Sequence, residues 1–247
     1  MPSGLLPDLF RGLPQQGPGS DASTSRALAF LPELGTTPRI LDVGCGSGRQ
    51  SLALARQTGG TIVAVDLLEE LLEQLRAQAA AEGVDQQIDT RCKSMADLDF
   101  AERSFDLIWS EGAIYNMGFQ AGLEAWRPLL RADGVVAVTE LTWLTHSPPA
   151  PAVDFWSAAY PGMGTLDENR RRTVAAGFHP IGGFVLPEED WWSGYYGELE
   201  RRILERRPRT TEPAALAVLD QTQAEIDLFR ARKGSYGYVF YLMRLAS

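Results

Sequence analysis

The chain of 247 residues is poor in the side chains that most often bind metals or form cross-links. It contains 2 cysteines, Cys45 and Cys92, and 2 histidines, His146 and His179. Neither cysteine has a second cysteine or a histidine at the spacing of a metal site, so we expect no metal centre. A structural disulfide is not expected either, because the chain reads as a protein of a reducing compartment.

Long hydrophobic runs are also missing. No apolar stretch approaches the roughly 20 residues that a helix needs to cross a bilayer. Residues 1–8 (MPSGLLPD) lack the basic start and the apolar core of a secretory signal. We therefore expect a cytoplasmic protein without a membrane partner.

Positive charge is in deficit, with 23 Lys and Arg against 32 Asp and Glu and a formal net charge of -9. Such a field repels polyanions, so we do not expect nucleic acid as a substrate or partner. The arginine clusters at 170–172 and 201–209 lie among acids in helical sequence. We interpret them as solvated helix faces.

Tryptophan and tyrosine are absent from the first 108 residues, and all 6 Trp and 7 Tyr follow. The first part is therefore predicted to be a plain scaffold. The later part holds the amphipathic rings that line substrate pockets. The same rings can equally form a core, and the sequence leaves both interpretations open.

The pattern of apolar residues predicts strands that alternate with helices. The expected strands are 39–43, 61–65, 88–92, 105–110, 135–141, 181–186 and 236–245. The expected helices are 21–35, 68–82, 120–130, 167–176, 188–207 and 212–232. This alternation indicates an α/β fold, with a mainly parallel sheet and helices on both faces.

Residues 40–48 (ILDVGCGSG) form an apolar run that ends in an acid and a glycine-rich turn, before helical sequence. A strand that turns sharply into a helix is expected to present backbone N–H groups to a ligand, and glycine permits the turn. The spacing of Gly44, Gly46 and Gly48 is one residue tighter than the G-x-G-x-x-G of nicotinamide sites. Asp66 ends the next strand, where a carboxylate can accept both ribose hydroxyls of an adenosine ligand.

The pattern D-x-G-x-G-x-G at 42–48 resembles motif I of the class I S-adenosylmethionine-dependent methyltransferases. The resemblance implies S-adenosylmethionine as cofactor, with the glycines under its methionine moiety, Asp42 at its amino-acid end and Asp66 at its ribose. The loop 94–100 (SMADLDF) resembles the segment that covers adenine. The implied cofactor-binding residues are Asp42, Gly44, Cys45, Gly46, Gly48, Asp66, Leu67, Ser94, Met95 and Glu111.

Further segments resemble small-molecule methyltransferases grouped with the ubiquinone and menaquinone biosynthesis type. They are 17–20 (GPGS) with Thr24, 109–119 (WSEGAIYNMGF), 186–192 (LPEEDWW) and 236–241 (YGYVFY). The resemblance implies a Rossmann-like sheet of seven strands whose last strand is antiparallel. We divide the single domain 1–247 into an irregular segment 1–20, a cofactor-binding core 36–141, a substrate or lid region with a helical insertion 142–235, and a final strand 236–247.

Residues that follow the strand 105–110 are expected to face the methyl group, because ligands bind beyond strand ends. The enzyme must align donor and acceptor and exclude water, and it can also remove a proton. We predict Glu111 as a proton acceptor or cation site, Tyr115 beside the sulfonium or substrate, and Asn116 as an orienting amide. The alternatives are a helix-capping acid, a core ring and a turn amide. His146 is a further candidate base, or else a histidine of a surface loop.

The predicted substrate-binding residues are Tyr115, Asn116, Trp143, Trp191 and Tyr195, whose rings suit a cation or an apolar ring equally well. The function that we predict is methyl transfer to a small-molecule acceptor. The alternative is a protein that binds S-adenosylmethionine or S-adenosylhomocysteine without turnover. A nicotinamide oxidoreductase is disfavoured by the glycine spacing and by the lack of a Tyr-x-x-x-Lys pair. The acceptor atom and the choice between monomer and homodimer stay open.

Overall fold

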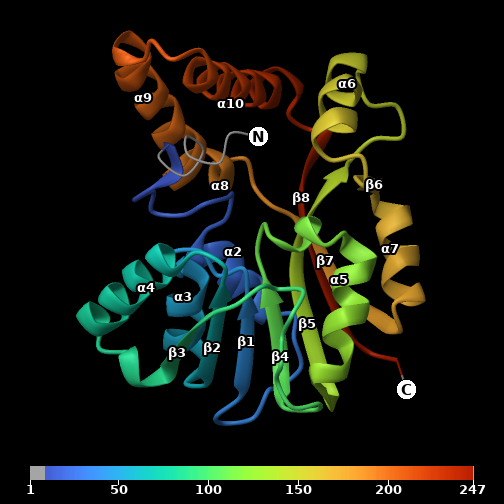
Figure 1. The fold of residues 1–247 in the computed structure, drawn as a ribbon. Helices are drawn as coiled ribbons and strands as arrows, with labels where there is room; N and C mark the ends of the chain where they lie inside the picture. Colours follow the sequence, from blue (N-terminus) through green and yellow to red (C-terminus); the bar gives the residue numbers. More distant parts are fainter. Residues whose placement is uncertain (1–8, 247) are drawn as a thin grey trace.

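The computed structural model describes residues 9–246, so residues 1–8 of the predicted N-terminal segment lie outside it (Figure 1). A single sheet runs through the molecule. Its strands are β1 (Arg39–Val43), β2 (Thr61–Asp66), β3 (Ile88–Cys92), β4 (Phe105–Ser110), β5 (Leu130–Trp143), β6 (Gly164–Thr165), β7 (Phe178–Val185) and β8 (Tyr236–Leu245). The strand order is β3-β2-β1-β4-β5-β8-β7, and the short β6 pairs with β5.

The direction of the strands determines where a ligand can bind. The strands β1 to β5 are parallel to one another, whereas β8 is antiparallel to both β5 and β7. This confirms the predicted α/β fold and its antiparallel last strand. The chain passes from β1 outward to β2 and β3, and then returns to the other side of β1 with β4. The strand order therefore reverses between β1 and β4, and open α/β sheets bind ligands beyond the carboxyl ends at such a point.

Two helical layers cover the sheet (Figure 1). Apolar residues of α2 (Asp21–Leu28), α3 (Arg49–Thr58) and α4 (Glu69–Glu82) pack on one face, while α5 (Phe119–Trp126) packs on the other, where α7 (Leu166–Ala175) also lies. Alternate strand residues supply both layers, because successive side chains of a strand point to opposite faces. The remaining short helices are η1 (Asp85–Gln87), η2 (Ile114–Asn116), η3 (Arg127–Leu129) and η5 (Arg207–Arg209).

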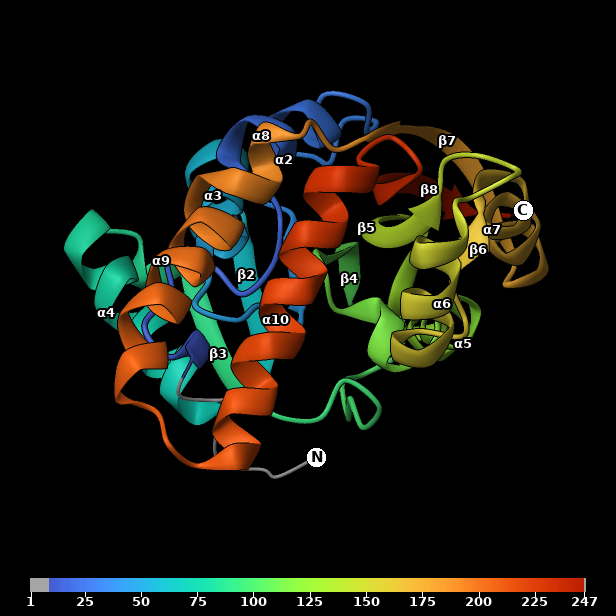
Figure 2. The same ribbon diagram turned by 90° about the horizontal axis from the view of Figure 1, so that it is seen from above.

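A third apolar cluster lies beyond the sheet. We define the cap as α6 (Ala150–Ala159), α8 (Glu189–Trp191), the irregular turn η4 (Trp192–Tyr196), α9 (Gly197–Arg206) and α10 (Pro213–Arg232). Seen from above, α10 runs across the end of the sheet between α9 and α6 (Figure 2). Arg202 of α9 donates hydrogen bonds to the carbonyls of Leu9, Arg11 and Gly12 at 2.5 to 3.1 Å, which fastens the N-terminal segment to the cap.

Several element boundaries differ from the prediction for local reasons. The helix expected over 21–35 ends at Leu28, and Phe30 instead stacks on Phe184 of β7 at 6.1 Å between ring centroids. The helix α6 was not predicted, because prolines precede and begin it, although Pro is well tolerated in a first helical turn. Within residues 9–246, no helix combines the length and the apolar composition needed to span a membrane.

The turn between β1 and α3 owes its shape to glycine. Gly44, Gly46 and Gly48 have φ values of +71°, +56° and +87°, in the left-handed region that side chains disfavour. A Cβ on Gly48 would lie 2.1 Å from Cδ1 of Leu75 on α4, so the bare Cα lets α4 pack against the start of α3.

Asp42 joins β1 to α3 beneath this turn. Its fully buried carboxylate accepts hydrogen bonds from Ser51 Oγ at 2.5 Å and from Gln50 Nε2 at 3.3 Å. Burial raises its pKa to about 7, because loss of hydration outweighs the stabilising effect of the two donors. The free-energy cost of burying the Asp42 carboxyl group therefore depends on pH.

Gly48→Ala is expected to destabilise the fold strongly, because the new Cβ meets Leu75 as well as an unfavourable φ. Gly83→Ala is the matched control, since Gly83 ends α4 with φ +72° and has nothing within 4 Å of its Cβ position. We expect the control to lose about 1–2 kcal/mol from the left-handed backbone alone. Gly48→Ala should lose a further ~1–3 kcal/mol of unfolding free energy because of overpacking. Urea denaturation measures both losses. Equal losses in the two variants would show that the contact with Leu75 costs nothing.

Asp42→Asn tests the cost of the buried carboxyl group. An unfolded Asp titrates near pH 3.9, whereas folded Asp42 has a pKa of about 7, so the folded state retains a proton that the unfolded state has lost between these values. Stability of the wild type should therefore fall as pH rises from 4 to 7 relative to the variant, by about 2–4 kcal/mol. Urea denaturation at pH 4.5 and 7.5 measures the difference. A constant difference between the two proteins would mean that Asp42 ionises normally in the folded state.

Candidate functional site

The carboxyl ends of β1 and β2 bring Asp66 next to the glycine turn. Its Oδ2 accepts the N–H of Gly46 at 2.8 Å, and its Oδ1 accepts the N–H of Leu68 at 3.0 Å. An ionised carboxylate offers about four acceptor positions, so two of them are available for other donors. Asp66 thus lies where the sequence placed a ribose-binding acid, and it also holds the turn.

The backbone N–H groups of residues 44–48 are all used within the protein. The N–H groups of Gly44 and Cys45 both donate to the Val65 carbonyl, at 2.8 Å and 3.0 Å. Those of Gly46 and Ser47 donate to the Asp66 carboxylate at 2.8 Å and to Gln16 Oε1 at 2.9 Å. The N–H of Gly48 donates to the Cys45 carbonyl at 3.0 Å. The prediction that this turn presents unpaired N–H groups to a ligand is therefore wrong. The sequence did not reveal that Gln16 covers the turn from the N-terminal segment.

The glycines at 44–48 instead permit close approach. A Cβ on Gly44 would lie 2.4 Å from Cβ of Ala113 and 3.4 Å from Cε of Met95. Cys45 is buried, and burial raises the pKa of its thiol well above the ordinary value, so the thiol stays neutral. The fully buried Asp42 can influence a ligand only through the turn that it supports.

The residues predicted to surround adenine lie after β2 and β3. Leu67 directly follows Asp66 and is 68% exposed. Ser94 is exposed and Met95 half-buried, and the Met95 carbonyl accepts a hydrogen bond from Trp126 Nε1 at 3.0 Å. This edge therefore combines an exposed apolar side chain with the acid of β2.

Glu111 has a structural environment that the sequence did not indicate. Its side chain is 4% exposed and forms an ion pair with Arg49, with Oε2 2.5 Å from Nη2. Its Oε1 accepts hydrogen bonds from Trp109 Nε1 at 2.8 Å and from Thr24 Oγ1 at 2.9 Å. Gly19 packs directly on the pair, because its Cβ position is 2.8 Å from Glu111 Oε2. Glu111 thus ties β4 to α2 and α3, and its charge is neutralised, which argues against the free base that we predicted.

Tyr115 and Asn116 lie in η2, which follows β4. Asn116 donates from Nδ2 to the Ala113 carbonyl at 2.9 Å, so it is the turn amide of the alternative interpretation. Tyr115 is 39% exposed, and its ring lies edge-on to Tyr160 at 5.7 Å. Partial burial raises the pKa of Tyr115, with smaller contributions from the Glu225 and Glu140 carboxylates.

The other predicted substrate and catalytic residues occupy different environments. His146 is exposed in the loop after β5, as the surface-loop interpretation expects. Trp191 is 2% exposed and stacks on Phe229 at 4.2 Å, so it belongs to the core of the cap and does not line a pocket. Trp143 and Tyr195 are half-buried at the inner side of the cap.

Two acids near Tyr115 were missed. Glu140 of β5 is fully buried, and neither carboxylate oxygen forms a hydrogen bond of ordinary geometry, although the Tyr160 hydroxyl is close. Burial raises its pKa to about 8. Glu225 of α10 accepts a hydrogen bond from the Tyr196 hydroxyl at 2.7 Å, and burial raises its pKa. In the sequence, Glu140 is marked only as a lone acid within the apolar run 135–143. Glu225 is marked only by its position next to Ile226, which is buried in the structure.

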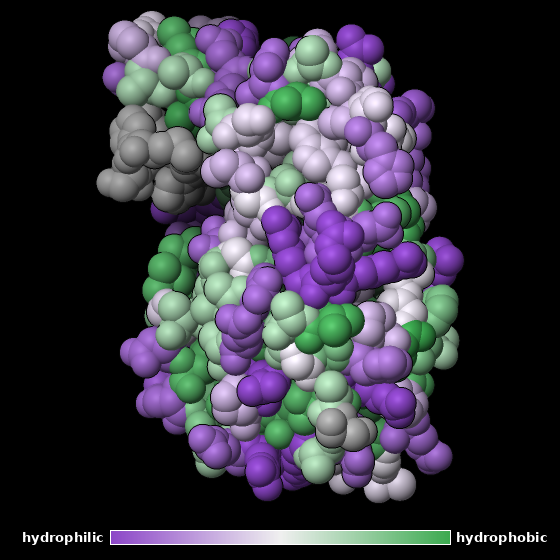
Figure 3. Space-filling model, turned by 90° about the vertical axis from the view of Figure 1, so that its right-hand side faces the viewer, coloured by the Kyte–Doolittle hydropathy of each residue, from purple (hydrophilic) through white to green (hydrophobic). Residues whose placement is uncertain are grey.

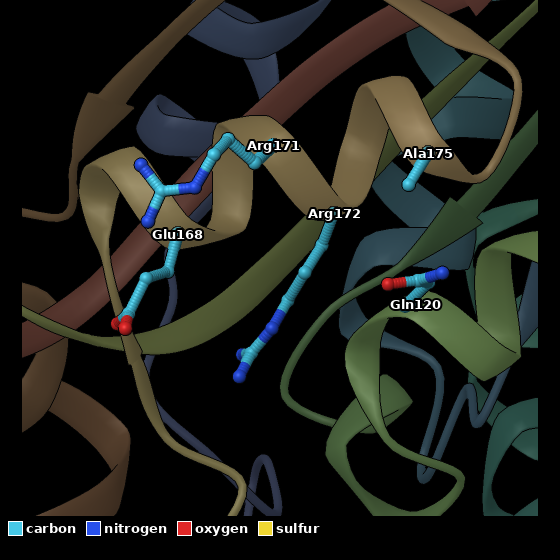
Figure 4. A pocket seen from close by; sticks show the side chains of 5 residues that line it. All are labelled: Gln120, Glu168, Arg171, Arg172 and Ala175. Carbon is cyan, nitrogen blue, oxygen red and sulfur yellow. The ribbon is translucent and has the colours of Figure 1, made fainter.

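A shallow pocket between α5 and α7 contains none of the predicted residues. Its lining residues are Gln120, Glu168, Arg171, Arg172 and Ala175 (Figure 4). Glu168 closes the N-terminal cap of α7 with Thr165, and Arg172 donates to the Gly162 carbonyl at 2.9 Å. Figure 3 shows a hydrophilic band across this side of the molecule. Among residues 9–246, no group of histidine, cysteine or acidic side chains is arranged to hold a metal ion.

Comparison with known proteins finds methyltransferases. A family model described as a methyltransferase domain matches residues 40–134. Methyltransferase GfsG of Streptomyces halstedii is 30% identical over 104 residues, which are 42% of this chain and 37% of GfsG. The 27-O-demethylrifamycin SV methyltransferase of Amycolatopsis mediterranei is 25% identical over 236 residues, which are 90% of this chain and 82% of that protein.

The chain spans well under two thirds of GfsG and only 24% of another curated relative. The fold is shared with the crystal structure of an S-adenosylmethionine-dependent methyltransferase from Geobacter sulfurreducens in complex with S-adenosylhomocysteine. The TM-score is 0.83 at 17% identity, covering 98% of this chain and 97% of that one. Residues 40–134 therefore match a methyltransferase domain, and the chain shares its fold with an S-adenosylmethionine-dependent methyltransferase.

Proposed function

We propose that the protein transfers the methyl group of S-adenosylmethionine to a small-molecule acceptor. The observation that carries the proposal is the position of Asp66, whose carboxylate lies beside the glycine turn, one strand from the point where the strand order reverses. Ligands of open α/β sheets bind beyond the strand ends at that point. The whole-chain likeness to named methyltransferases supports turnover over the alternative of a protein that only binds the cofactor.

The residues at this edge fit the cofactor. Asp66 has acceptor capacity for ribose hydroxyls, and the exposed Leu67 offers an apolar surface to a base. The bare Cα of Gly44 lets Ala113 and Met95 pack close to the turn, beside the place proposed for the methionine moiety. The cofactor supplies a methyl group that is already activated on a sulfonium, so the protein has to align the acceptor and exclude water.

The position of the cap favours a small molecule as the methyl acceptor. The helix α10 crosses the carboxyl end of the sheet, so an acceptor must fit beneath it or enter from its sides (Figure 2). The net charge of -9 disfavours a polyanion. A cytoplasmic location is part of the proposal, because both Cys45 and Cys92 are free thiols.

Asp66→Ala is expected to weaken S-adenosylhomocysteine binding by about 10- to 100-fold in isothermal titration, because charge-assisted hydrogen bonds to the ribose are lost. Asp66→Asn should retain part of the affinity, since one oxygen can still accept the N–H of Gly46. Asp89→Ala on β3 is the control, because Asp89 pairs with Arg91 on the surface at 2.7 Å. Affinity unchanged in Asp66→Ala would refute the ribose assignment.

Glu111→Gln is expected to lower the unfolding free energy by about 2–4 kcal/mol, because it leaves the Arg49 guanidinium without its partner. Turnover per folded molecule should be nearly retained. Glu124→Gln, an exposed position on α5, controls for the loss of one charge and should leave stability unchanged. Normal urea denaturation combined with abolished turnover would instead restore Glu111 as a catalytic base.

A further inference from the structure

The buried and half-buried acids of the described residues differ in their partners. Glu111 pairs with Arg49, and the buried Asp42 and Asp190 accept hydrogen bonds from neutral side chains. Glu225 and Glu140 form no ion pair with any described cationic residue, although Glu140 is fully buried and Glu225 is half-buried. Within residues 9–246, Glu225 Oε1 accepts the Tyr196 hydroxyl, and Oε2 has no hydrogen-bond partner. A carboxylate that lacks both water and a counter-charge is costly, so its retention calls for an explanation.

Tyrosine rings surround Glu225. Tyr195 stacks on Tyr196 at 5.0 Å, and Tyr196 donates its hydroxyl to Glu225 at 2.7 Å. The Glu225 carboxylate helps to raise the pKa of five tyrosines, although burial is the main cause in each case. These are Tyr115, Tyr195, Tyr196, Tyr236 and Tyr238. They come from η2, η4 and β8, so the acid on α10 faces rings from three separate parts of the chain.

Glu140 approaches the same group of rings from β5. Its two oxygens are fully buried and unpartnered, next to the Tyr160 hydroxyl. Like Glu225, it contributes to the raised pKa of Tyr115 and Tyr238. Tyr115 therefore lies close to both acids, and it follows β4, at the edge where the proposed methyl donor binds.

This arrangement fits a small cation. The faces of tyrosine rings attract ammonium groups, and the attraction grows when water is excluded. An ammonium placed against Glu225 would supply the counter-charge that the described residues do not supply. A neutral phenol would donate a hydrogen bond to the Glu225 carboxylate but leave its charge uncompensated, and an anionic acceptor would be repelled.

We propose that the acceptor is an amine, held as its ammonium by Glu225 among Tyr115, Tyr195 and Tyr196. This inference rests on the proposed function. The ammonium first passes one proton to the Glu225 carboxylate, which frees the nitrogen lone pair. A nitrogen–carbon bond to the methyl group then forms as the sulfur–carbon bond breaks, and the bonding pair stays on sulfur. The products are the methylated ammonium and a neutral thioether, and Glu225 later releases its proton to water.

The test uses tetramethylammonium chloride as a cation that cannot react, titrated into the full-length protein saturated with S-adenosylhomocysteine. Sodium chloride controls for ionic strength, and neopentyl alcohol is a neutral probe of similar shape. We expect the wild type to bind tetramethylammonium in preference to neopentyl alcohol. Glu225→Gln should weaken tetramethylammonium binding about tenfold, while its affinity for S-adenosylhomocysteine stays that of the wild type, which also shows that the variant is folded.

Asp227→Asn is the matched control, because Asp227 is an exposed acid on the same helix that pairs with Arg230 at 2.8 Å. It should bind tetramethylammonium as the wild type does. Equal affinity of Glu225→Gln and the wild type for tetramethylammonium, or no preference over neopentyl alcohol, overturns the amine proposal and leaves methyl transfer intact. If Glu225→Gln weakens binding of S-adenosylmethionine but not of S-adenosylhomocysteine, the acid serves the sulfonium and the proposal is also wrong. Failure of the wild type to bind S-adenosylhomocysteine at all would instead refute the proposed function.

Discussion

The connection between β1 and α3 is the constraint on which the rest of this structure depends. The turn needs three glycines with positive φ, and it closes because its own N–H groups find acceptors on β2, on Gln16 and within the turn. Asp66 contributes twice, since the carboxylate that holds Gly46 also faces the edge where a ribose would bind. The turn is therefore fully bonded before any ligand arrives. A preorganised site of this kind loses little conformational entropy on binding.

The distribution of charge separates scaffold from site. Glu111 lies almost as deep as Glu140, yet it receives an arginine, an indole N–H and a hydroxyl, and so it acts as a fastening between β4 and two helices. Glu140 and Glu225 receive at most a tyrosine hydroxyl. Groups whose pKa is strongly perturbed by burial cluster at functional sites. By that criterion, Glu140 and Glu225 belong to the proposed acceptor site, and Glu111 is expected to have a structural role.

The strands β1 to β4 and β8 could be predicted closely because a buried strand leaves a short apolar run between turn residues, and each run is read locally. The glycine turn and Asp66 were found for the same reason. Contacts across long sequence separations could not be read in this way. Arg49 and Glu111 are 62 residues apart, and Gln16 reaches Ser47 across 31 residues, so neither partner is visible from the motif. The helix α6 was hidden by prolines, and Trp191 was assigned to a pocket because an aromatic ring alone does not reveal which side it faces.

The cap shows why an acid on an amphipathic helix is easily overlooked. On α10, Ile226 and Phe229 are buried, and Glu225 directly precedes Ile226, so helical periodicity alone places it at the margin of the apolar face. Once α10 lies across the sheet, Glu225 at that margin is half-buried and accepts the Tyr196 hydroxyl of η4. An acid in such a place lowers the stability of the unliganded cap, since nothing described beside it supplies a positive charge. A cationic ligand would offset that cost, because it would supply the counter-charge that the half-buried acid lacks.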